Sequence, residues 1–119
     1  MNTQRHEIEA WLGDNHGLDD DQIDQLVNIC DTIAARYPDA DDQPERDAAL
    51  TAAYRILAGE DILDELGKEH ADAVAADARA LAGLQQAAHM LIGQTISENA
   101  FRERGRLNRM SVRKWLGKR

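Results

Sequence analysis

The sequence predicts an all-α protein with an N-terminal helical bundle, a long central helix and two short C-terminal helices. Three observations support this fold class. Apolar residues make up 43% of the 119 residues but aromatic residues only 4%, and no run of β-branched residues favours a strand. Apolar residues recur at intervals of three and four, which is the period of an amphipathic helix. Glycine and proline stand where these patterns stop. At this length we expect one domain, or one domain with a helical arm.

The first two predicted helices cover residues 3–12 and 20–37. In the first, Ile8, Trp11 and Leu12 share a face, and Gly13 follows the last apolar residue. Asp19 and Gln22 have the spacing of a capping box, in which each side chain bonds the other residue's backbone N–H at the start of a helix. The second helix has the clearest amphipathic pattern in the chain, with Ile23, Leu26, Val27, Cys30, Ile33, Ala34 and Tyr37 on one face. Pro38 ends it, because the residue before proline is disfavoured in the helical region.

The third predicted helix covers residues 44–58, and a longer one runs through residues 61–94 with Gly67 as the one candidate break. Gly59 closes the third helix, whose expected inward face is Ala49, Ala52, Ala53, Ile56 and Leu57. The longer helix places Val74, Leu81, Leu84, Ala88 and Leu91 at heptad positions, with Asp77 interrupting them. Because fewer than three full repeats are present, we expect a spine packed on the N-terminal helices, with a coiled coil as the alternative.

The last segment, TISENAFRERGRLNRMSVRKWLGKR, predicts two short helices joined by a tight turn. Thr95 and Glu98 have capping-box spacing, and Ile96, Ala100 and Phe101 form an apolar stripe. Gly105 is expected to end this helix in the left-handed conformation. Leu107 is the apolar residue of the turn, and Asn108 is a favourable N-cap for the second helix. That helix has an apolar face and a polar, cationic one; the apolar face is Val112, Trp115 and Leu116.

The segment RLNRMSVRKWLGKR resembles the second helix of helix-turn-helix domains in small regulatory proteins of bacteria and phages, in particular of actinobacteria and their phages. Such domains usually have alanine where this chain has Arg102, and glycine where it has Arg106. The resemblance covers about a fifth of the chain, or nearer a third with the preceding helix. It implies a DNA-binding module over residues 84–119, joined by the long helix of residues 61–94 to an acidic helical region of residues 1–60.

The charge distribution agrees with that division. The chain has a net charge of −8, but residues 1–97 have 20 acidic and 6 basic side chains, and residues 98–119 have 2 acidic and 8 basic ones. A cationic segment on an acidic body is typical of a nucleic-acid-binding element. The alternative is a solvated basic tail, yet an unfolded tail needs no periodic apolar residues.

Nothing in the sequence predicts an enzyme or a cofactor. The four histidines have no metal-ligand spacing, and the acids near His16 lack the pattern of a calcium loop. The lone cysteine, Cys30, falls on an apolar helix face and excludes an internal disulfide. No apolar run reaches the roughly 18 residues of a membrane span. We therefore expect a soluble, cytoplasmic protein that contacts no membrane.

The resemblance assigns provisional roles to the polar residues of the C-terminal segment. Residues near the start of the second helix read bases in the major groove, and the surrounding cations hold phosphates. The expected base-reading residues are Asn108, Arg109, Ser111 and Arg113, and the expected phosphate contacts are Arg102, Arg104, Arg106, Lys114, Lys118 and Arg119. The expected partner is double-stranded DNA bound by a homodimer. The alternative is an interaction adaptor whose basic helices dock an acidic protein, with a protein partner for the acidic N-terminal half.

Overall fold

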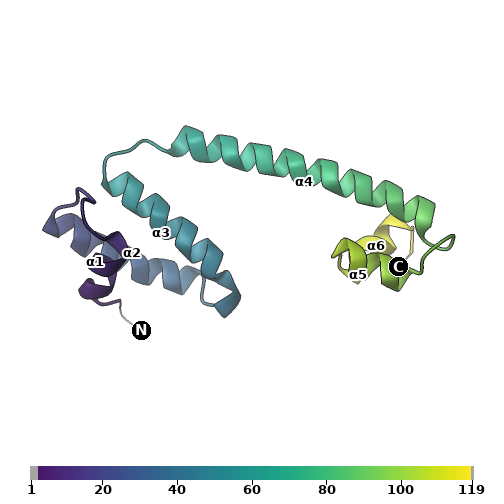
Figure 1. Ribbon diagram of the computed structural model, residues 1–119, viewed down its shortest axis with the longest axis horizontal. Helices are drawn as coiled ribbons and strands as arrows, with labels where there is room; N and C mark the ends of the chain where they lie inside the picture. Colours follow the sequence, from purple (N-terminus) through teal and green to yellow (C-terminus); the bar gives the residue numbers. More distant parts are fainter. Residues whose placement is uncertain (1–2, 119) are drawn as a thin grey trace. The chain divides into compact units, whose positions relative to one another are not determined.

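The computed structural model describes residues 3–118, and the whole of that range is helical or loop. It contains the helices α1 to α6 and one short 3₁₀ turn, η1, with no β-strand among the described residues (Figure 1). The prediction of an all-α protein is confirmed. The chain divides into two compact units, residues 1–66 and 67–119, and α4 passes from the first into the second. No helix in residues 3–118 combines the length and the apolar character needed to cross a membrane.

The first unit is built from α1 (Arg5–Leu12), α2 (Asp20–Arg36), η1 (Ala40–Asp42) and α3 (Gln43–Leu57). Helix α2 contacts both α1 and α3. The capping box predicted at the start of α2 is present: the Gln22 backbone N–H donates to Asp19 over 2.8 Å, and the Asp19 N–H donates to Gln22 over 3.0 Å. The core of the unit consists of Ile8, Leu18, Ile23 and Leu26, with Leu12, Val27, Cys30, Leu50, Ala53, Tyr54 and Leu57 packed around it.

The predicted inward face of α3 is confirmed in part: Ala53 and Leu57 pack on the core, but Ile56 does not. Leu50, Ala53, Tyr54 and Leu57 pack inward, whereas Ile56 is 59% exposed. The side chain of Tyr54 decides this orientation. Its ring meets Trp11 edge-on with 6.3 Å between ring centroids, and its hydroxyl donates to the His16 carbonyl over 2.8 Å. The inward face therefore includes Leu50 and Tyr54 in place of the predicted Ile56.

Two arginines hold the first unit together at its surface. Arg5 on α1 pairs with Glu9 and reaches across to Asp20 and Asp24 at the start of α2. Arg55 on α3 pairs with Glu60 and with Glu65, so it ties α3 to the first turn of α4. Hydrogen bonds from Arg55 lower the pKa of Glu65 below that of a free glutamate.

Helix α4 (Leu63–Leu91) is continuous through Gly67, so the break considered there is absent. Every residue from 63 to 83 is exposed, and burial begins only at Leu84, Ala87 and Ala88. The expectation that this helix packs along the N-terminal helices concerns the placement of the two units and stays a prediction. What holds residues 67–83 helical is local: the segment is rich in alanine, and Lys68 pairs with Asp72 one turn later.

Candidate nucleic-acid interface

The second unit ends in three helical segments that enclose a small apolar core. The C-terminal turns of α4 pack with α5 (Glu98–Gly105) and α6 (Arg109–Trp115) (Figure 1). Ala88, Phe101 and Val112, one from each helix, are buried at the centre. The residues predicted to be structural, Leu107, Trp115 and Leu116, lie around that centre together with Leu84, Ala87, Ile92 and Ile96. The apolar face predicted for the last helix is therefore confirmed.

Helix α5 begins two residues later than the Thr95 capping box predicts. Its N-cap is Ser97, whose hydroxyl accepts from the Ala100 N–H over 3.1 Å. The reason lies in the preceding loop. The Ile96 carbonyl accepts from the Gly93 N–H over 3.0 Å, and the Ile96 N–H donates to the Leu91 carbonyl over 3.2 Å. These bonds fix residues 91–96 as a turn on the end of α4, so the helix starts only after Ile96.

The connection between α5 and α6 consists of Arg106, Leu107 and Asn108. The left-handed residue is Arg106, with φ 56°, and not Gly105 as predicted. Gly105 serves a packing role instead, because a Cβ there would lie 3.1 Å from Leu107 Cδ1 and 3.5 Å from Leu84 Cδ2. Asn108 is the N-cap of α6, as predicted: its side-chain oxygen accepts from the Ser111 N–H over 2.8 Å.

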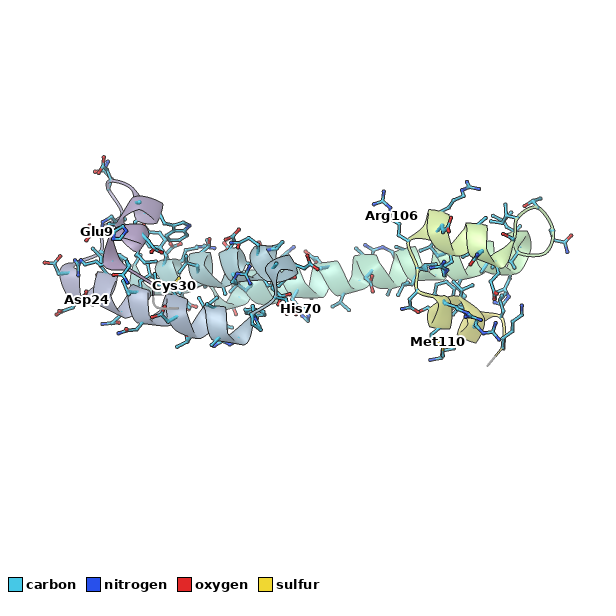
Figure 2. All side chains as sticks on the ribbon, turned by 90° about the horizontal axis from the view of Figure 1, so that it is seen from below. Glu9, Asp24, Cys30, His70, Arg106 and Met110 are labelled. Carbon is cyan, nitrogen blue, oxygen red and sulfur yellow. The ribbon has the colours of Figure 1, made fainter. Side chains whose placement is uncertain are left out.

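The outward face of α6 follows from the position of Val112. A residue two places away on a helix lies about 200° around the axis, so Met110 and Lys114 point away from the core that Val112 enters. Both are exposed, Met110 to 70%, and Figure 2 shows Met110 on the side of α6 that faces away from the other two helices. A surface hollow on this face is lined by Asn108, Met110, Ser111, Lys114 and Lys118.

Four of the predicted site residues, Asn108, Ser111, Lys114 and Lys118, line this hollow, and the predicted residues differ in exposure. Arg106, Asn108, Arg109, Lys114 and Lys118 are exposed, whereas Arg102, Ser111 and Arg113 are half-buried. Arg102 donates to Asn99 over 3.5 Å, and Arg113 also makes an interaction within the protein. Arg119 lies outside the described residues. The predicted base-reading residues are therefore not equivalent, because Asn108 and Ser111 share the cap of α6 and, of the two arginines, Arg109 is exposed and Arg113 half-buried.

Acidic side chains are few on this surface. Helix α6 contains none, and the α5 carboxylate of Glu98 lies 3.7 Å from Lys118 Nζ. Glu98 Oε1 is buried and has no hydrogen-bond donor among the described residues, and Lys118 is its ion-pair partner. Arg106, Arg109 and Lys114 have no acidic partner among the ion pairs of residues 3–118. The exposed surface is cationic.

No known protein family, curated protein or solved structure matches this chain. The site therefore has to be interpreted from its own geometry. One residue of that site was missed in the sequence: Met110. The signal was its spacing: Met110 is two residues from Val112, which places it on the side of the helix opposite the core.

Proposed function

We propose that the protein binds duplex DNA through α5 and α6 as a helix-turn-helix and acts as a transcriptional regulator rather than an enzyme. One observation carries the proposal: α6 rests on an apolar core and turns an acid-free face with Arg109, Lys114 and Lys118 toward solvent. A helix supported in this way enters the major groove, where cations neutralise phosphates on either side. The turn of Arg106, Leu107 and Asn108 has the length of the connection in such domains.

The side chains divide into two roles by their exposure and existing bonds. Arg109, near the start of α6, is exposed and has the donors for a bidentate contact with guanine. Asn108 is assigned to the fold, because its cap on Ser111 engages the oxygen that a bidentate contact with adenine also needs. Arg106 at the turn and Lys118 beyond the end of α6 flank the helix and suit phosphate contacts.

The length of α6 argues for a dimer on DNA. Its 7 residues span about 10 Å, which matches about three base pairs at 3.4 Å each. Three base pairs specify too little sequence for a regulator, whereas two copies on half-sites one helical turn apart double the contact. We therefore propose binding as a homodimer. Light scattering after gel filtration tests this directly: a monomer both alone and on DNA overturns it.

Fluorescence anisotropy with a labelled random duplex at a series of salt concentrations tests DNA binding. If four phosphates are neutralised, the log–log salt slope is about −3.6, and the loss of one contact reduces its magnitude by about 0.9. Arg109→Ala and Lys114→Ala remove exposed cations from α6 without touching the core. Arg79→Ala is the matched control, since Arg79 is exposed on α4 in the same unit. Absence of binding at low salt, or equal losses in all three variants, overturns the proposal.

A second candidate function is a protein-interaction adaptor, and a feature of the first unit favours it. Ile56, Leu63 and Leu66 are exposed large apolar residues, and they line a hollow together with Glu60, Asp61 and Ile62. An apolar surface beside acids suits a protein segment that is apolar and basic. We propose this surface as the site for the protein partner expected of the acidic half. In the anisotropy experiment, the absence of DNA binding at low salt would favour the adaptor.

A further inference from the structure

Met110 has no role in the fold of the second unit. It is 70% exposed, it belongs to neither apolar core, and it lies on the side of α6 opposite the buried Val112. Single exposed apolar residues are common on protein surfaces and need no explanation by themselves. Met110 differs in its surroundings, because it lines a hollow with Lys114 and Lys118 and is next in sequence to the exposed Arg109.

The residues around Met110 are arranged on both sides of it. At about 100° per residue, Arg109 and Arg113 fall on one flank of α6 and Ser111 on the other, with Lys114 one turn further along the same line as Met110. Lys118 lines the same hollow as Met110. The line through Met110 and Lys114 is opposite the buried Val112, so it is the part of α6 that would face the base edges when α6 lies in the groove.

We propose that Met110 recognises thymine, by packing its thioether side chain against thymine 5-methyl groups in the major groove. This inference rests on the proposed DNA binding and adds to it a base preference. The 5-methyl group is the one apolar group that unmodified base pairs present in the major groove. Methionine suits it, because its unbranched side chain adapts to an irregular apolar contact. Among the described residues that line this hollow, Met110 is the one with a fully apolar side chain, so we assign the preference to it.

The size of the effect follows from burying one methyl group. Removing it from water favours binding about fourfold for each thymine contacted. Deoxyuridine pairs like thymidine but lacks the methyl group, so the exchange of one for the other isolates this contact. The change leaves phosphates and hydrogen-bonding base edges as they were, and the salt dependence of binding is therefore expected to stay the same.

The experiment uses the full chain and a duplex pool selected from a random library by the wild-type protein. The pool is then copied with dTTP or with dUTP, and affinity for each copy is measured by anisotropy at one salt concentration. Wild type is expected to bind the uracil copy about fourfold more weakly for each contacted methyl group. Met110→Ala is expected to bind both copies equally, at the wild-type affinity for the uracil copy. Met90→Ala is the matched control, because Met90 on α4 is 62% exposed and should keep the discrimination.

The outcomes separate the two proposals. Equal wild-type affinity for the two copies overturns the role of Met110, and so does an undiminished thymine preference in Met110→Ala. If Met110 contacts a protein instead, Met110→Ala has wild-type affinity for both copies, which also overturns the inference. A wild-type protein that binds no duplex and enriches no sequence overturns the proposed function itself. Because Met110 is exposed, its substitution should leave the unfolding of the second unit unchanged, and a urea titration followed at Trp115 checks this.

Discussion

Replacing Val112 with alanine tests the packing on which the proposed interface depends. Val112 is 0% exposed and lies between α4 and α5 at the centre of the second unit's core. The change removes two methyl groups, worth about 1.6 kcal/mol in transfer free energy, and leaves a cavity in a core that has few other side chains to close it. We expect the free energy of unfolding of the second unit to fall by about 2–3 kcal/mol. That is a large share of the stability of any small domain.

The two tryptophans allow each unit to be followed separately. Trp11 belongs to α1, and Trp115 to α6. In a Trp11→Phe background, the fluorescence of Trp115 reports the second unit alone during a urea titration. With a slope of about 1 kcal/mol per molar urea, Val112→Ala should lower the midpoint by about 2 M or leave no folded baseline. DNA affinity should fall in step with the folded fraction.

Val74→Ala is the matched control for this substitution. It makes the same chemical change on α4, but Val74 is 54% exposed. Alanine favours a helix slightly more than valine does, so the control should be neutral or stabilising by up to about 0.5 kcal/mol. If Val112→Ala costs no more than Val74→Ala, then α6 does not pack on α4 and α5 as described, and the argument for its outward face fails with it.

Three further predictions concern the caps and ion pairs. Asn108→Ala removes the cap bond to the Ser111 N–H and should destabilise the second unit by about 1 kcal/mol in the Trp115 titration, while Asn108→Asp should retain that stability. Arg106→Gly should stabilise the same unit by about 0.5 kcal/mol, since glycine accepts φ 56° without the cost that other residues bear, yet it should weaken DNA binding through the lost charge. The pair of Glu65 with Arg55 should stabilise the first unit at neutral pH. Because the folded pKa of Glu65 is lowered, that stability is lost as pH falls from the ordinary value of 4.5 toward the folded one. In Arg55→Met, thermal unfolding followed at Trp11 should show a smaller loss over the same range.

Much of the fold was predictable because its signals are local. The capping box of Asp19 and Gln22, the proline at position 38 and the Asn108 cap each act within one turn of a helix, and the structure has all three. The buried face of α2 followed from spacing alone, since large apolar residues recur through its length. Element type and the main helix boundaries therefore needed no knowledge of tertiary contacts.

The errors occur where a contact from another helix overrides a local preference. On α3, spacing favoured a face that includes Ile56, but the partners of Tyr54 are Trp11 and His16, which are distant in sequence. At the start of α5, Thr95 has the spacing of a capping box. The bonds of Ile96 to the end of α4 nevertheless exclude a helix there. In both cases the deciding partner lies on a different element, which periodicity within one helix does not reveal.

The turn before α6 is a third place where the structure differs from local preference, and it lies within the candidate site. Local preference places glycine in the left-handed position, and here that position has Arg106. Here Gly105 is the last residue of α5, where a Cβ would lie 3.1 Å from Leu107 Cδ1, and the left-handed residue is the next one, Arg106. Arg106 is exposed there, and Figure 2 shows it on the opposite side of the unit from Met110. Arg106 combines a strained backbone conformation with a charge that we propose contacts phosphate. Arg106→Gly should therefore raise the stability of the second unit and lower its DNA affinity.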